Sequence, residues 1–194
     1  MSRILENTMQ QLKRVRYQRI ELQGVLKYRS TPRSLGSLHG LRIGTANDPG
    51  GVIHCSSLLL KAACEENQLR LRVKRKAQRE SGAPESPKPF TWWLRSTLND
   101  GSEVMFEIEN AMTITGRAEN CDLLLPLPHI SRKHVALTPD SGGIMVEDLN
   151  SSNGVSINDN PVQKAILHAG DVLELAGLLF VAVRYTPEDG ILIA

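Results

Sequence analysis

The chain has 194 residues and a formal net charge of +2 at pH 7, but this near balance conceals two parts of opposite sign. Residues 1–80 hold 16 basic and 6 acidic side chains, a balance of +10, whereas residues 81–194 hold 7 and 15, a balance of −8. There is no apolar run of the roughly 18 residues that a membrane span needs, no apolar secretion signal near the start, and no C-x-x-C pair among the three cysteines. We therefore expect a cytoplasmic protein whose two parts attract each other or whose basic part seeks an acidic partner.

Residues 3–28 are predicted to form a helix, because apolar side chains recur on one face and the first proline follows at Pro32. Two interpretations stay open. The helix could associate with a second copy of itself as a coiled coil, or it could dock as a single amphipathic helix on its own chain, which is the more common outcome.

The segment 30–51 is rich in Gly, Pro, Ser and Asn, which is typical of a loop. A short helix is then predicted over Leu58 to Glu66, with Asn67 as its stop. The run 69–74 alternates like a half-buried strand but leads into a basic stretch that suits an exposed helix end, so both interpretations remain.

The basic run from Arg70 to Arg79 contains no aromatic side chain that could stack on a base. Nucleic acid or an anionic membrane is thus a weaker prediction for residues 1–80 than a solvated face or a surface that docks on the acidic half. Residues 81–90, which include the stretch SGAPESPKP, are predicted to be a linker. We expect a basic, partly helical N-terminal region over 1–80, its fold left open, and a separate domain over 91–187, followed by a tail at 188–194.

Short apolar or alternating runs recur through 91–187, separated by turn residues, with no segment of helical length between them. This spacing predicts a mostly β domain, a β-sandwich of two packed sheets or a barrel. The expected strands are 91–94, 104–108, 112–115, 123–125, 134–137, 144–149, 155–157, 172–175 and 178–185.

Four polar clusters interrupt these runs in a fixed order. They are Gly116-Arg117, then Ser131-Arg132-Lys133-His134, then Asp148 to Gly154, and last Asn158 with Gly170-Asp171 behind it. In this order, with the run CDLLL between the first two clusters, residues 92–186 resemble the forkhead-associated (FHA) domain. The resemblance implies a phosphothreonine-binding β-sandwich whose binding loops would be 116–122, 126–133 and 149–154.

A phosphothreonine carries close to two negative charges and three strong acceptor oxygens, so its site needs cations and hydroxyl or N–H donors that converge. Arg117 can supply a guanidinium fork, Ser131 and Ser152 hydroxyls, and Arg132 a second charge. Asn153 has an amide that both donates and accepts, as a clamp on a peptide backbone requires.

The resemblance assigns further roles to the residues around these donors. It places Asn153 against the peptide backbone beside the phosphorylated residue and His129 where the third residue after it is read. It makes His134 a structural residue that bonds across loops, next to the structural glycines Gly116 and Gly154. At the fourth cluster the family usually has an Asn-Gly turn, so we expect Asp159-Asn160 to supply the positive φ here.

Catalysis and metal binding find little support in the sequence. A relay of Ser131, His134 and Asp148 is conceivable, but there is no Gly-x-Ser-x-Gly elbow and the phosphate site uses the same residues. The scattered histidines and cysteines show no ligand spacing, so we expect no enzyme activity, no cofactor and no metal.

The leading hypothesis is thus an adaptor or regulator in Ser/Thr-kinase signalling that binds a phosphothreonine-containing protein, such as a kinase or its substrate. The alternative is a phosphate-independent assembly component, for example of a bacterial secretion or division machine, as the resemblance also implies. A smaller hypothesis is self-recognition, because Thr45 is followed three residues later by Asp48 within the predicted loop.

Overall fold

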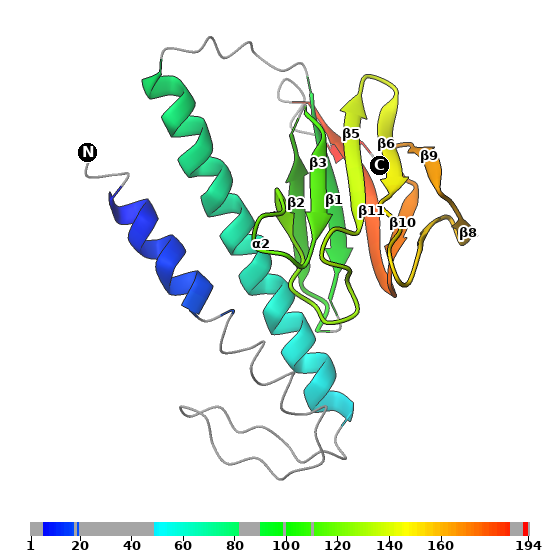
Figure 1. The fold of residues 1–194 in the computed structure, drawn as a ribbon, viewed down its shortest axis with the longest axis horizontal. Helices are drawn as coiled ribbons and strands as arrows, with labels where there is room; N and C mark the ends of the chain where they lie inside the picture. The colour runs from blue at the N-terminus through cyan, green and yellow to red at the C-terminus, as the bar shows by residue number, and fades with distance from the viewer. Residues whose placement is uncertain are drawn as a thin grey trace.

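The computed structural model describes residues 6–17, 19, 49–81, 90–98, 100–109, 111–186 and 192–193. They form a β-sandwich with two helices along one side (Figure 1). Within these ranges, no helix has both the length and the apolar character needed to cross a bilayer. The predicted linker at 81–90 lies almost wholly outside the described residues, as do Thr45 and most of the expected 30–51 loop.

Two sheets make up the sandwich, which confirms the predicted mostly β architecture. The first has the order β2-β1-β11-β10-β7-β8 with β12 paired to β11, and the second has the order β4-β3-β5-β6-β9. The strands of the first sheet are β1 (Thr91–Thr97), β2 (Glu103–Ile108), β7 (Val155–Ile157), β8 (Asn160–Pro161), β10 (Val172–Leu175), β11 (Leu178–Tyr185) and β12 (Leu192–Ile193). Those of the second are β3 (Thr113–Gly116), β4 (Leu123–Leu124), β5 (Val135–Asp140), β6 (Gly143–Asp148) and β9 (Lys164–Leu167).

The core lies between the sheets and is built from alternating inward side chains. Along β1, Trp92 and Leu94 are buried while their neighbours are half exposed, as the period of two requires. Trp92 also donates its indole N–H to the carbonyl of Asp140 on the opposite sheet at 2.9 Å. Phe106 and Phe180 meet edge to face with ring centroids 6.0 Å apart.

The turn after β7 differs by one residue from the expected position. Positive φ falls on Asn158 (48°) and Asp159 (63°), not on Asp159 and Asn160. The reason is the Asn158 side chain, which accepts from the N–H of Val172 at 2.9 Å and donates to Asp171 at 2.8 Å. This pair of bonds holds Asn158 in the left-handed region that Asn tolerates.

Helix α2 (Pro49–Glu80) is far longer than the predicted short helix, and the predicted stop at Asn67 is wrong. Asn67 is buried in the middle of α2, where its amide donates to the carbonyl of Leu124 and accepts from the N–H of Leu124, both at 3.0 Å. These tertiary bonds outweigh the weak helix propensity of Asn. The alternating run 69–74 therefore belongs to the helix, and the expected loop ends before Pro49.

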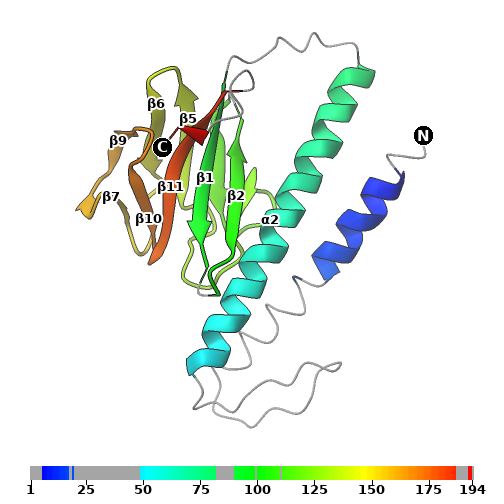
Figure 2. The same cartoon turned by 180° about the vertical axis from the view of Figure 1, so that it is seen from behind.

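Helix α2 runs along the side of the sandwich where the edge strands β2 and β4 lie (Figures 1 and 2). Leu59, Leu60 and Cys64 belong to the same buried cluster as the sandwich core. The Cys64 thiol also donates to the carbonyl of Met105 on β2 at 3.1 Å. The helix thus covers strand edges that would otherwise expose unpaired backbone groups.

Ion pairs fasten the basic helix to the acidic sandwich. Lys61 contacts Asp100 at 2.6 Å, and further along α2 Lys74 pairs with Glu109 and Arg75 with Glu107. Of the meanings weighed for the basic run 70–79, the structure shows docking on the acidic half of the chain for Lys74 and Arg75, whereas Arg72 is exposed.

The N-terminal helical segment (6–17 and 19) lies beside α2, on the side away from the sandwich (Figure 2). Leu12 and Val15 form a small buried cluster with Leu69 of α2. This is the docked arrangement of the two that the heptad-like pattern left open, and residues 20–28 of the predicted helix lie outside the described residues.

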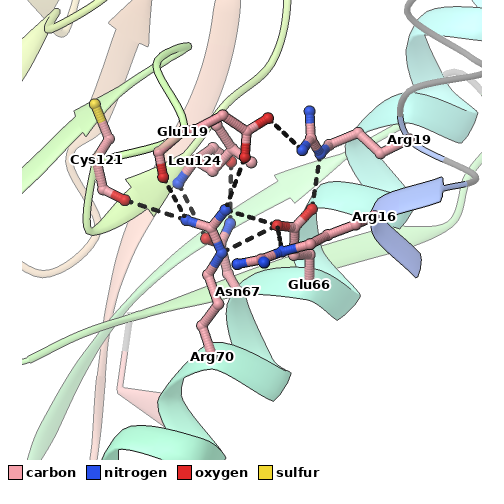
Figure 3. A network of polar contacts seen from close by, with 8 residues as sticks. All are labelled: Arg16, Arg19, Glu66, Asn67, Arg70, Glu119, Cys121 and Leu124. Atoms are coloured by element: carbon pink, nitrogen blue, oxygen red, sulfur yellow. Dashed lines mark hydrogen bonds and ion pairs between the residues drawn. The ribbon is translucent and has the colours of Figure 1, made fainter. Parts of the chain in front are cut away.

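A buried carboxylate joins the two helices (Figure 3). The Glu66 side chain is 0% exposed and accepts from Nε of Arg16 at 3.0 Å, Nε of Arg19 at 2.7 Å and Nη2 of Arg70 at 2.6 Å. Burial by itself raises the pKa of Glu66, but hydrogen bonds and charges from Arg19 and Arg70 more than offset it and lower the pKa.

We predict that Glu66→Gln lowers the free energy of unfolding by about 3 kcal/mol, because it removes the buried carboxylate that Arg19 and Arg70 share and leaves them only the exposed carboxylate of Glu119. Chemical denaturation at pH 7 measures this loss. Glu80→Gln is the control. The Glu80 side chain is 55% exposed and its carboxylate lies 4.0 Å from Lys76, which is a long and weak ion pair, so the substitution should change stability by less than about 1 kcal/mol. An equal effect of the two substitutions would contradict the prediction.

The lowered pKa also gives the sign of the acid dependence. The contribution of Glu66 is present above its usual pKa of 4.5 and is lost as the pH falls through the lower folded value. The Glu66→Gln variant should therefore lose less stability on acidification than the wild type.

Candidate functional site

Loops 117–122 and 125–134 run side by side at one end of the sandwich. The N–H of Arg117 donates to the carbonyl of Ser131 at 3.0 Å, and that of Ala118 donates to the carbonyl of Arg132 at 3.1 Å. These bonds join the two loops just beyond the ends of the antiparallel strands β3 and β5. The first two polar clusters of the sequence are therefore brought into direct contact.

Gly116 is required by this close approach. A Cβ atom at position 116 would lie 2.4 Å from the carbonyl oxygen of Arg132, a distance that no side chain tolerates against backbone. The absence of a side chain is thus what allows Arg117 and Ser131 to stand next to each other.

His134 is fully buried and links three segments. Its Nδ1 accepts from the N–H of Ser131 at 3.1 Å, and its Nε2 lies 3.1 Å from the carbonyl of Gly154, to which the neutral ring donates in the tautomer that this pattern implies. Its backbone pairs with Thr115 and Leu149 at 2.8 and 2.9 Å. The ring therefore ties loop 149–154 to the loop that carries Ser131, and the backbone of the same residue bonds to the end of β3.

Two further hydrogen bonds join loop 149–154 directly to loop 125–134. The Ser131 hydroxyl accepts from the N–H of Ser152 at 3.0 Å, and the Asn153 amide donates to the carbonyl of His129 at 2.7 Å. Asn150 and Gly154 both have positive φ, 56° and 75°, which gives the loop its reversal. The turn residues of this stretch thus shape a surface that its polar side chains complete.

The three loops surround one open depression. It is lined by Arg117, Ala118, Asn120, Ser131, Arg132, Lys133, Asn150 and Ser152. Four of the six residues predicted to contact a phosphopeptide are among them, whereas His129 and Asn153 lie outside the lining and bond to each other. Lys133 and Asn120 were not predicted, although Lys133 stands inside the Ser131-x-x-His134 cluster and could have been found there.

The depression carries positive charge that no acidic side chain among the described residues neutralises through an ion pair. Arg117, Arg132 and Lys133 are exposed, and none of them takes part in an ion pair within the described part of the chain. By contrast, Arg70 and Arg75 on α2 each pair with a carboxylate. Three cations beside two serine hydroxyls form a donor set suited to a tetrahedral oxyanion.

His129 is neutral near pH 7. Partial burial and, to a smaller extent, the neighbouring His134 lower the pKa of His129 below its usual 6.5. Protonation of His129 is therefore confined to acidic solution.

The conceivable Ser131-His134-Asp148 relay is not formed. Both ring nitrogens of His134 bond to backbone groups, and Asp148 accepts from the N–H of Ser151 at 2.9 Å. The Ser131 hydroxyl contacts Ser152 instead of an imidazole. Neither His134 nor Asp148 is therefore placed to take the proton of Ser131.

Comparison with known proteins identifies the family. The family model described as FHA domain matches residues 113–176, which span the three loops and the strands between them. The chain contains an FHA domain. It is 36% identical over 78 residues to the FHA domain-containing protein FhaA of Mycobacterium tuberculosis, a match covering 40% of this chain and 15% of FhaA.

Further similar proteins share the same domain. The glycogen accumulation regulator GarA of Mycolicibacterium smegmatis is 32% identical over 77 residues, which are 40% of this chain and 48% of GarA. The FHA domain of FhaA, solved in complex with the intracellular domain of Rv3910, aligns with 31% identity and a TM-score of 0.41, covering 48% of this chain and 98% of that one. The chain thus spans less than half the length of the curated relatives it first matches, and the helices lie outside the matched FHA segment.

We predict that Gly116→Ala destabilises the FHA domain by about 2 kcal/mol, because the added methyl group forces apart the backbones of the first two loops. Gly142→Ala is the matched control, since a Cβ there meets no atom within 4 Å. Thermal unfolding of both variants measures the difference. Equal melting temperatures would show that the loops accommodate the methyl group.

Proposed function

We propose that this FHA domain binds a phosphothreonine-containing segment of a partner protein in the depression between its three loops. The observation that carries the proposal is the convergence of Arg117, Ser131 and Ser152 on one depression with no compensating carboxylate among the described residues. Cations left unpaired at a protein surface raise the local concentration of anionic ligands. A phosphorylated side chain supplies the charge and the acceptors that this donor set lacks.

In this proposal Arg117 binds the phosphate with its guanidinium fork, and the hydroxyls of Ser131 and Ser152 donate to it. Arg132 and Lys133 add positive charge at the rim, which favours acidic residues near the phosphothreonine. These contacts are charge-assisted and therefore among the stronger hydrogen bonds.

Beside the phosphate pocket, Asn153 and His129 form the surface over which the peptide backbone passes. Their mutual bond orients the Asn153 amide, whose carbonyl oxygen stays available to accept from a peptide N–H. Gly116, His134 and Gly154 act as structural residues of the site.

We further propose that the chain acts as an adaptor in Ser/Thr-kinase signalling, with a phosphorylated kinase or kinase substrate as its partner. Two features support this: the FHA domain family is a family of binding modules, and the FhaA domain was solved with the intracellular domain of another protein. A pull-down from native lysate with and without phosphatase tests the role. Partners that survive phosphatase treatment would instead support a phosphate-independent assembly component.

We predict that Arg117→Ala weakens binding of a phosphothreonine peptide by about 2 kcal/mol, roughly thirtyfold, which is the size of a hydrogen bond to a charged group. Calorimetric titration with matched phosphothreonine, phosphoserine and unphosphorylated peptides measures the effect. Arg72→Ala removes the same charge from an exposed position on α2 and should leave affinity unchanged. Binding indifferent to phosphate or to Arg117 would overturn the proposal.

The neighbouring residues Asn153 and Gly154 should separate binding from folding. We predict that Asn153→Ala abolishes detectable peptide binding and costs about 1 kcal/mol of stability, the net value of its bond to His129. Gly154→Val should instead destabilise the domain by about 2 kcal/mol, because valine is strained at a φ of 75°. Parallel titration and denaturation of the two variants would show the separation, and a similar profile for both would contradict it.

A further inference from the structure

The loop that carries Arg117 is also held from its outer side, by α2. Arg70 directs Nη1 to the carbonyls of Glu119 and Cys121, at 3.1 and 3.3 Å, and places Nη2 3.4 Å from the Glu119 carboxylate. One guanidinium thus satisfies two backbone acceptors and one side chain of a six-residue loop. A lysine could not make these contacts at once, because it lacks the planar fork of donors.

The N-terminal helical segment reaches the same loop. Arg19 is only 2% exposed and bonds to Glu66 with Nε and to the Glu119 carboxylate with Nη2. Glu119 is therefore linked through two arginines, one on each helix, to the single buried carboxylate of Glu66 (Figure 3). Contacts from both helices thus meet at Glu119, two residues after Arg117.

Helix α2 also fixes the C-terminal end of loop 117–122. The Asn67 amide pairs with the backbone of Leu124, and the next residue, Leu125, donates to the carbonyl of Gly116 at 2.8 Å. Loop 117–122 is thus clamped between the second binding loop on one side and the two helices on the other.

We propose that Arg70, together with Arg19, Glu66 and Glu119, forms a positioning network for Arg117, so that affinity for the phosphopeptide depends on the docked N-terminal helices. The inference rests on the proposed function of the depression. Arg70 and Glu66 do not line that depression, so they act through the loop and not on the ligand. The phosphate-binding unit of this chain is then larger than the FHA domain alone.

Glu119 distinguishes positioning from simple electrostatics. It is 62% exposed and carries a negative charge two residues from Arg117, so a purely coulombic effect predicts tighter phosphate binding when it is removed. Positioning predicts the opposite, because without the carboxylate both arginines lose their hold on the loop side chain.

The test is a calorimetric titration of the full chain with one phosphothreonine peptide. We expect Arg70→Met and Glu119→Ala each to weaken binding about tenfold, within the usual range of coupling between sites. Arg70→Lys keeps the charge but should bind as weakly as Arg70→Met. Arg75→Met is the matched control: Arg75 pairs with Glu107 on β2, away from the loop, so affinity should change less than about twofold.

A second measurement keeps this inference separate from the proposed function. Hydrogen exchange of the free chain reports the loop directly through the bonded amides of Arg117, Ala118 and Cys121. Faster exchange at these amides in Arg70→Met than in Arg75→Met is expected whether or not the peptide binds.

The outcomes separate cleanly. Tighter or unchanged binding by Glu119→Ala, or equal weakening by Arg75→Met, would overturn the positioning network while Arg117→Ala still reports on the site. Failure of wild type to prefer the phosphorylated peptide would overturn the proposed function. In that case unchanged loop exchange in Arg70→Met would refute the positioning role as well.

Discussion

The rest of the structure depends on one constraint: the edges of β2 and β4, the terminal strands of the two sheets on one side of the sandwich, have to be covered. A strand edge presents unpaired N–H and C=O groups, and β4 has only two residues with which to hold its place. The Asn67 amide takes the place of a neighbouring strand, because it donates to the carbonyl of Leu124 and accepts from the N–H of Leu124. With α2 in this position, basic side chains of the helix lie opposite carboxylates of the sandwich and form ion pairs with them, as Lys61, Lys74 and Arg75 do. The charge asymmetry of the sequence is thus the signature of an intramolecular interface.

At the end of the sandwich where the three loops meet, one set of residues supports the loops and another lines the depression. The support is buried: Gly116 admits a backbone contact that any side chain would block, and His134 joins three segments through hydrogen bonds to their backbone groups. The contact surface above it is exposed and cationic. Arg117, Arg132 and Lys133 form no ion pair with any described residue, which forgoes the small stabilisation of surface ion pairs but leaves these donors available.

Sequence patterns predicted the strands well because the information is local. Alternation with a period of two and flanking turn residues give the bounds of 155–157, 172–175 and 178–185 as the structure has them. The same reasoning missed β9 at Lys164–Leu167, where only the last residue is buried. It failed at Asn67 because the signal that keeps the helix going is a partner 57 residues away. Of the residues that line the depression, those with a recognisable type and order could be predicted, whereas Asn120 joins it through the path of the folded loop.

The network around Glu66 could not be predicted for the same reason, since it joins Arg19 to Glu119 across 100 positions. Its value is better understood as geometric than as energetic. Burying charges is costly, and a buried ion pair often stabilises a fold no more than apolar packing would, but it tolerates one arrangement and penalises every other. The two helices reach loop 117–122 through these ion pairs and through the bonds from Arg70 to the carbonyls of Glu119 and Cys121, which hold them to one position relative to Arg117. Thermodynamic linkage then runs in both directions: if docking of the helices raises affinity for the phosphopeptide, binding of the phosphopeptide strengthens docking by the same factor. A partner that draws the N-terminal helices away would thus compete with the phosphopeptide without touching its site.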